Sequence, residues 1–169
     1  MRLDRYLSGT ARLRTCCLAA TVAALGSCTA APSPPPGDRR TVPAEPPDVA
    51  IERFVALAQA ARRDAGCPTL AWDDRAADVA AAHSRDMLER GYFSHRSPDG
   101  STPFDRMRAV GITFSAAAEN IGYGALTGEA AFRQWMGSAG HRRNLLNCRY
   151  TRHGVGVAGD RWTHLLFAP

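Results

Sequence analysis

Residues 135–146 read Trp-Met-Gly-Ser-Ala-Gly-His-Arg-Arg-Asn-Leu-Leu, and this stretch says more about the fold than any other part of the chain. It completes an apolar segment that opens at Thr127 and has the spacing of an amphipathic helix. Gly140 indicates that the helix has ended, so we predict a turn over the following residues. The sequence therefore predicts that His141 and Asn144 lie on a turn directly after a helix.

The segments on both sides of this stretch predict a mixture of helices and strands. The predicted elements are, in chain order, helices over 48–66, 73–91 and 102–111, a short strand or turn over 118–124, the helix over 127–136, and a hairpin over 153–167. Asp48 is the expected cap of the first helix. Leu70–Trp72 is expected to be a short apolar link. We therefore expect three or four helices and a small antiparallel sheet.

Seven short motifs follow one another in this region. They are Ala-x-x-His-Ser-x-x-Met (80–87), Gly-Tyr-Phe-Ser-His (91–95), Ser-Pro-Asp-Gly (97–100), Ala-Glu-Asn-Ile (118–121), the stretch 135–146, Gly-Val-Gly-Val-Ala (154–158) and Trp-Thr-x-x-x-Phe (162–167). Together they resemble the bacterial branch of the CAP superfamily (SCP-like), named for cysteine-rich secretory, antigen 5 and pathogenesis-related proteins. The resemblance covers residues 48–169. It implies an α+β fold, a three-layer α-β-α sandwich with a small antiparallel sheet.

The same resemblance implies a polar cleft at the surface. Family members often carry two histidines and two acids there, and His95 and Glu119 match two of these four positions. Ser138 stands in the place of the second acid, and Arg161 stands in the place of the second histidine. The predicted cleft residues are His95, Glu119 and His141, with Ser138 and Asn144 at the edge.

Four roles remain open for such a cleft. Two imidazoles and a carboxylate (His95, His141 and Glu119) could hold Zn²⁺ with one coordination position open, which suits a metal-dependent hydrolase or protease acting on cell-surface or cell-wall material. A hydrogen-bonded polar cluster could instead only order the loops. A nucleophilic pair of Ser138 and His141 lacks an identified orienting acid. Most relatives resemble binders or effectors rather than enzymes, so the resemblance favours non-enzymatic binding of a lipid, a cell-wall component or another protein.

The remaining histidines and the tryptophans are expected to have structural roles. His83 lies on an apolar helical stripe, which favours a position in the core. His153 and His164 fall on predicted strands with no partner motif, and we expect them to be structural or solvent-facing. The residues expected to build the core through large aromatic surfaces are Trp72, Trp135 and Trp162.

The N-terminal region has the layout of an export signal followed by a tether. Residues 1–27 combine an arginine-bearing start with an apolar stretch too short to span a bilayer. Leu25-Gly26-Ser27-Cys28 resembles the bacterial lipobox, which predicts a lipidated Cys28 and a membrane-anchored lipoprotein of the cell envelope. Residues 28–47 are rich in proline and predict an extended linker. Ordinary cleavage near residues 29–31, giving a fully secreted protein, is the alternative.

The cysteines and the charges of the chain bear on its disulfide bonding and on its partners. Cys67 and Cys148 are the two cysteines left in the predicted domain, and an exported chain favours a disulfide between them. Two buried free thiols are the alternative. The formal charge of +5 falls to +2 without the first fourteen residues, since 17 arginines then face 15 acids. No basic stripe with interleaved aromatic residues remains, so we expect no nucleic-acid partner.

Overall fold

The computed structural model describes residues 43–169. The predicted signal (1–27), Cys28 and the linker up to residue 42 lie outside the described residues. The elements, in chain order, are α1 (Pro47–Asp64), β1 (Ala71–Trp72), α2 (Asp74–Glu89), α3 (Pro103–Ala109), β2 (Ala116–Tyr123), α4 (Gly128–Gly137), α5 (Ala139–Leu145), β3 (Arg152–Ala158) and β4 (Arg161–Ala168).

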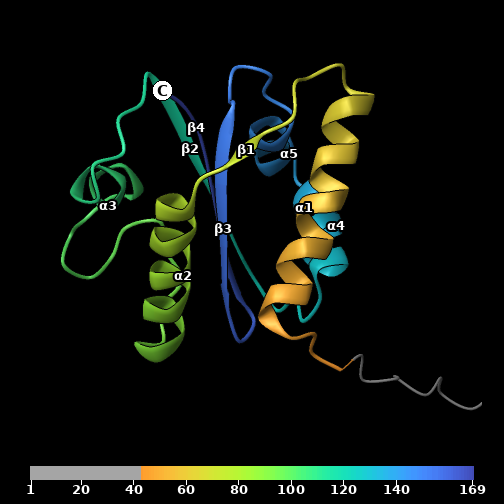
Figure 1. Cartoon of the computed structure of the whole chain (residues 1–169). Coiled ribbons are helices and arrows are strands. Elements are labelled where there is room, and N and C mark those ends of the chain that lie inside the picture. The colour runs from red at the N-terminus through yellow and green to blue at the C-terminus, as the bar shows by residue number, and fades with distance from the viewer. Residues whose placement is uncertain (1–42) are drawn as a thin grey trace, which may run out of the picture. The chain divides into compact units, whose positions relative to one another are not determined.

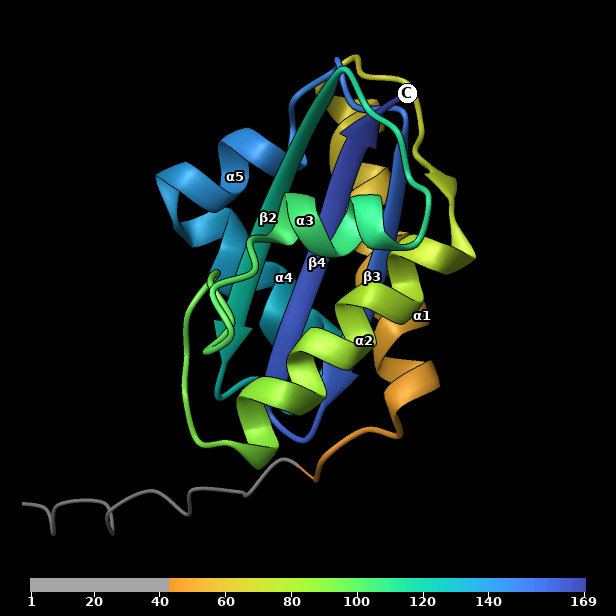
Figure 2. The same ribbon diagram turned by 90° about the vertical axis from the view of Figure 1, so that its left-hand side faces the viewer.

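The four strands form one sheet between two helical layers, in the order β1-β3-β4-β2. Strands β2 and β3 both pair antiparallel with β4. Figure 1 shows α2 and α3 on one face of the sheet, and α1, α4 and α5 on the other. Figure 2 looks onto the face that α2 and α3 cover. The predicted α+β three-layer sandwich is confirmed, as is the hairpin, whose two-residue turn contains Gly159 at a φ of +56°.

Two local predictions were wrong. The expected link at residues 70–72 contains β1, which pairs parallel to β3, so the sheet is not wholly antiparallel. The expected turn after Gly140 is the helix α5, which raises the number of helices from three or four to five among the described residues. Such a short helix gains its stability from packing rather than from propensity, and Leu145 is buried in the core.

The core lies on both faces of the sheet. Phe54 of α1 packs edge-on against Trp135 of α4, with ring centroids 5.1 Å apart. Trp162 joins the same cluster. On the other face, Gly154 and Gly156 of β3 let the backbone of α2 approach so closely that a Cβ at either position would clash with it. Of the three tryptophans, Trp72 departs from the prediction because it is exposed rather than in the core.

The C-terminal end of α1 is held in place by a disulfide and a buried arginine. Cys67 and Cys148 are bonded, which confirms the predicted disulfide. Closing a loop of 81 positions contributes on the order of 4 kcal/mol in the chain-entropy model. The fully buried Arg62 donates hydrogen bonds to the carbonyl oxygens of four residues, namely Pro68, Leu145, Asn147 and Tyr150. This end of α1 is therefore held to the segment that leads into β3.

The residues just before the N-terminal end of α1 are hydrogen-bonded to the rest of the domain. Pro47 occupies the first turn, where proline is tolerated because its missing N–H is not needed, and the helix starts one residue ahead of Asp48, the expected cap. The Glu45 N–H donates to the Leu126 carbonyl at 2.9 Å, and the Glu45 carboxylate accepts from the Gly128 N–H at 2.9 Å. None of the helices in residues 43–169 is long and apolar enough to cross a bilayer.

Candidate functional site

A buried carboxylate with two cationic or polar partners forms the centre of the site. Glu119 projects from the middle of β2, and its side chain is only 1% exposed. One oxygen accepts from His95 Nδ1 at 2.7 Å, and the other accepts from Arg106 Nη2 at 2.8 Å. His95 lies on the loop between α2 and α3, with 53% of its side chain exposed. Because a carboxylate only accepts, Nδ1 carries the hydrogen and the Nε2 edge of His95 is left for another partner.

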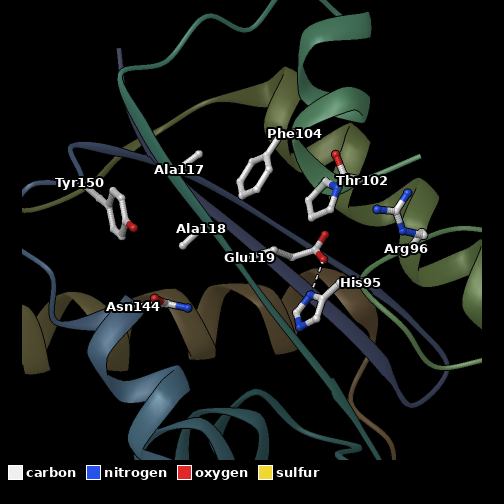
Figure 3. Close-up of a pocket in the computed structure, with 10 residues that line it drawn as sticks. His95, Arg96, Thr102, Phe104, Ala117, Ala118, Glu119, Asn144 and Tyr150 are labelled. Carbon is white, nitrogen blue, oxygen red and sulfur yellow. Dashed lines mark hydrogen bonds and ion pairs between the residues drawn. The ribbon is translucent and has the colours of Figure 1, made fainter. Parts of the chain in front are cut away.

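His95 and Glu119 border a pocket of about 460 Å³. Its lining residues are His95, Arg96, Thr102, Pro103, Phe104, Ala117, Ala118, Glu119, Asn144 and Tyr150. Figure 3 shows Tyr150 and Asn144 on one side of β2, and Phe104 and Thr102 on the other. The pocket therefore has an apolar floor and a polar edge, contributed by elements far apart in the sequence.

Arg106 positions the loop that carries His95. Besides Glu119, its guanidinium donates to the His95 carbonyl at 3.1 Å, to Ser97 Oγ at 3.1 Å and to the Ser101 carbonyl at 3.2 Å. A capping box at Thr102 sets the start of α3 and hence the face on which Arg106 lies. Arg106 was not predicted from the sequence, because an arginine in a short helix is usually a solvent-exposed charge.

A buried asparagine ties α5 to the sheet beside the pocket. Asn120 Oδ1 accepts from Asn144 Nδ2 at 2.8 Å, and Asn120 Nδ2 donates to the His141 carbonyl at 3.1 Å. Asn120 is fully buried. Asn144, predicted at the edge of the cleft, thus lines the pocket, and its bond to Asn120 holds it there. Only the Ala-Glu-Asn motif could have suggested this role of Asn120.

Neither His141 nor Ser138 lines the pocket. The His141 ring lies beside Trp135, with centroids 6.3 Å apart, and its Nδ1 finds no partner within residues 43–169. Burial lowers the pKa of His141, and the charge of His95 lowers it further, so the two imidazoles interact. Ser138 forms the junction between α4 and α5. Of the five predicted cleft residues, three line the pocket: His95, Glu119 and Asn144.

The predicted zinc ligands do not fit a metal centre in this arrangement. No group of three or more His, Cys, Asp or Glu side chains in the described part of the chain is placed to hold a metal ion. Arg106 also puts a positive charge 2.8 Å from the carboxylate that would have to bind the cation. His95 and Glu119 therefore form an ordered polar pair that Arg106 already neutralises.

The other histidines are buried. His83 is 2% exposed, and its Nε2 lies 3.0 Å from the Ser94 carbonyl, which confirms the predicted core position. His153 and His164 face each other, with His153 Nδ1 3.1 Å from His164 Nε2. Burial lowers the pKa of His153 to about 4 and that of His164 well below its usual range. Their structural role is confirmed, and the solvent-facing alternative was wrong.

Comparison with curated proteins identifies relatives of unassigned activity. The uncharacterized protein YkwD of Bacillus subtilis (strain 168) is 40% identical over 114 residues, which is 66% of this chain and 44% of that protein. The uncharacterized membrane protein YlbC of the same strain is 44% identical over 98 residues, 58% of this chain and 28% of that protein. The chain therefore spans less than half the length of either curated relative.

Comparison with solved structures supports the same fold. An extracellular protein containing an SCP domain from Bacillus anthracis str. Ames has a TM-score of 0.71 at 38% identity, covering 73% of this chain and 41% of that chain. An outer surface protein of Borrelia burgdorferi has a TM-score of 0.66 at 18% identity, covering 70% of this chain and 92% of that chain, and shows the fold alone. The model of CAP, the cysteine-rich secretory protein family, matches residues 55–164. This chain therefore belongs to the CAP family of cysteine-rich secretory proteins.

Proposed function

We propose that this chain is an exported, lipid-anchored envelope protein whose CAP domain binds an envelope component without catalysing a reaction. The observation that carries the proposal is the open pocket in which Glu119 holds His95 and leaves the Nε2 edge of the imidazole free. The lipobox-like stretch at Cys28 supports the anchor. The extracellular description of the SCP-domain protein from B. anthracis supports export.

The lining of the pocket suits a ligand with both apolar and hydrogen-bonding parts. Phe104, Ala117 and Ala118 supply apolar surface, while Asn144 and the free edge of His95 supply polar contacts. A volume of about 460 Å³ lies within the range of small-molecule sites. Among lipids, wall components and proteins, the hydroxyl and amide groups of wall saccharides and peptides match this lining best.

The contacts around the pocket weigh against catalysis. Glu119 has both oxygens occupied and a guanidinium beside it, so it is not free to accept a proton from a substrate. Thr102 carries the aliphatic hydroxyl of the lining, and it donates to Asp105 at 2.6 Å within the capping box. The alternative, a zinc-dependent hydrolase or protease acting on surface or wall material, requires Arg106 to leave Glu119.

Titration calorimetry with soluble peptidoglycan fragments tests the binding proposal. We expect His95→Ala and Asn144→Ala each to weaken binding about tenfold, because each removes one hydrogen-bonding group from the pocket. Asp78→Ala, an exposed change on the outer side of α2, is the matched control and should bind as the parent does. Unchanged binding in both pocket variants would refute the proposal.

Metal analysis distinguishes the zinc-dependent alternative. Binding without catalysis predicts no stoichiometric zinc in the purified chain and no change in melting temperature on adding zinc. If zinc is present in one equivalent and disappears in both His95→Ala and His141→Ala, the hydrolase interpretation replaces ours.

The anchor is tested separately with Cys28→Ser. We expect this change to abolish incorporation of labelled fatty acid and to release the chain from membranes. Membrane retention that is the same with and without the Cys28 thiol would contradict the lipoprotein assignment.

A further inference from the structure

Exposed apolar side chains gather at one end of the domain. In the described residues, the large hydrophobic side chains that are exposed are Val49, Trp72, Leu88, Phe93, Val110, Tyr123 and Leu126. Four of these, Leu88, Phe93, Tyr123 and Leu126, lie where α2 and β2 end, and we call them the apolar rim. Figures 1 and 2 show that α2 and β2 end near the start of α1. Single exposed hydrophobic residues are ordinary, but a gathered set marks an interaction surface.

Contacts make the apolar rim one continuous surface. The rings of Phe93 and Tyr123 meet edge to face, with centroids 4.9 Å apart. Leu88 packs against Gly159 in the β3–β4 turn. The neighbouring Asp160 accepts, through its carbonyl, from the Gly124 N–H at 3.0 Å, which brings this turn to the end of β2. The rim therefore runs from α2 across the hairpin turn to the segment after β2.

Two arginines beside the apolar rim are paired with carboxylates. Arg161 lies 2.8 Å from the Asp160 carboxylate and over the Tyr123 ring. Arg90 is 3.4 Å from Asp86. These arginines are already neutralised, so the surface offers apolar and aromatic contact rather than a cationic site for phosphate groups.

The chain enters the domain at this same end. The Glu45 N–H donates to the carbonyl of Leu126, a rim residue, at 2.9 Å. Cys28 precedes Pro43, the first described residue, by 15 positions. A chain of that length reaches at most about 50 Å when fully extended. If Cys28 is lipidated, Pro43, which lies close along the chain to the rim contact of Glu45, is within about 50 Å of the bilayer.

We propose that the apolar rim contacts the surface of the lipid bilayer to which the chain is anchored. This inference rests on the lipid anchor of the proposed function. Aromatic side chains with an apolar body and a polar edge, such as Tyr123, favour the membrane–water interface. A patch of four partly exposed side chains binds weakly alone, but the tether raises the effective concentration of membrane surface around it.

This orientation leaves the pocket accessible. Ala118 in the pocket floor and Tyr123 in the apolar rim lie on the same strand, five positions apart. At the usual strand rise, the floor lies about 17 Å from the rim along β2. This separation lets the rim contact the membrane while the pocket floor remains open to envelope components.

Fluorescence quenching by brominated lipids tests this contact. Phe93→Trp and Val110→Trp place a reporter at two sites of matched exposure, 43% in the rim and 42% outside it. The lipidated full chains are reconstituted in phosphatidylcholine vesicles containing brominated phosphatidylcholine, and the parent chain supplies the background of the native tryptophans. We expect the reporter at 93 to be blue-shifted and quenched severalfold more than the reporter at 110, with no dependence on salt.

Three outcomes overturn the proposal. Equal quenching at 93 and 110, or none at either, means that the rim does not touch the bilayer. Quenching that requires phosphatidylglycerol and disappears in salt means an electrostatic contact instead. A blue shift at 93 in the unlipidated Cys28→Ser chain, growing with protein concentration, points to a second copy as the occupant. Failure of the parent chain to float with vesicles refutes the anchor alone, and tethering it through a chelating lipid still tests the rim.

Discussion

Two histidine pairs in this domain have opposite surroundings. His153 and His164 face each other at 3.1 Å inside the core, and neither contacts a carboxylate. His95 pairs with the buried Glu119 at 2.7 Å, yet half of its own side chain is exposed. Near pH 7 the imidazole of His153 is neutral. In the pocket pair, Glu119 holds one edge of the His95 ring and the other edge is open to a ligand.

The difference comes from what packs on each side of the imidazole. His164 is enclosed by the rings of Phe54 and Trp135, which supply no charge and exclude water. Burial penalises the imidazolium, and it is the main reason why the pKa of His153 falls to about 4, with the charge of Arg62 lowering it further. His95 has the opposite arrangement, with the charge of Glu119 on one side and solvent on the other. A histidine on a strand or loop is therefore available for binding only when tertiary packing leaves one ring edge uncovered.

The largest expected effect comes from removing the carboxylate of the pocket pair. Glu119→Ala deletes the partner of both His95 and Arg106 and leaves a mostly buried guanidinium unpaired. Breaking a buried ion pair on one side typically costs about 3 to 5 kcal/mol of unfolding free energy. Urea unfolding at pH 7 measures this loss. A loss below about 1 kcal/mol, the range of exposed pairs, would show that the pocket pair contributes little to the fold.

Acid should lower the unfolding free energy of the domain through the core pair, His153 and His164, by a similar amount. The unfolded state takes up protons first, since the pKa of an unperturbed histidine is about 6.5 and that of folded His153 is about 4. This contribution is fully present above pH 6.5 and is lost as the pH falls towards 4. His153 alone should then cost about 3 kcal/mol between pH 7 and pH 4. Urea unfolding at several pH values measures the slope of the unfolding free energy against pH.

A variant with an apolar core pair provides the control. His153→Phe combined with His164→Leu should flatten much of the slope between pH 6.5 and 4. Some slope will remain, because burial also lowers the pKa of His83 and of His141. An unchanged slope in the double variant would show that the core pair is not the origin of the acid sensitivity.

Removing the exposed member of the pocket pair should have a small effect on stability. His95→Ala loses an ion pair of which one side is half in solvent, and such pairs contribute about 0 to 1 kcal/mol. The same variant should weaken ligand binding, so the two measurements together separate binding from folding. A stability loss as large as that of Glu119→Ala would mean that His95 is a structural residue.

The smallest expected effect is a change in the titration of a neighbouring histidine. The charge of His95 lowers the pKa of His141, so His95→Ala should raise the pKa of His141 while burial still keeps it below its usual value. Nuclear magnetic resonance of the imidazole protons follows this titration directly. A pKa of His141 that does not move would place the two rings too far apart to interact.

Much of the site was predictable and the rest had no local signal. The Phe-Ser-His and Ala-Glu-Asn motifs identified His95 and Glu119, and the lining also contains the predicted Asn144. Arg106 and Asn120 were missed, since both act through bonds to distant segments that no spacing encodes. The helix α5 was missed because its glycine indicates a turn, while burial of Leu145 and bonding of Asn144 to β2 stabilise the helix.

The sequence by itself determined the periodic elements, the hairpin turn and the pair of cysteines, because these depend on local backbone preferences and on residue counts. Only the tertiary structure decided which histidine would be open and which would be enclosed. It also decided that Arg106 would neutralise Glu119. The physical reason is that the protonation and availability of a side chain depend on the charges and apolar groups packed around it. Those neighbours come from segments far away along the chain.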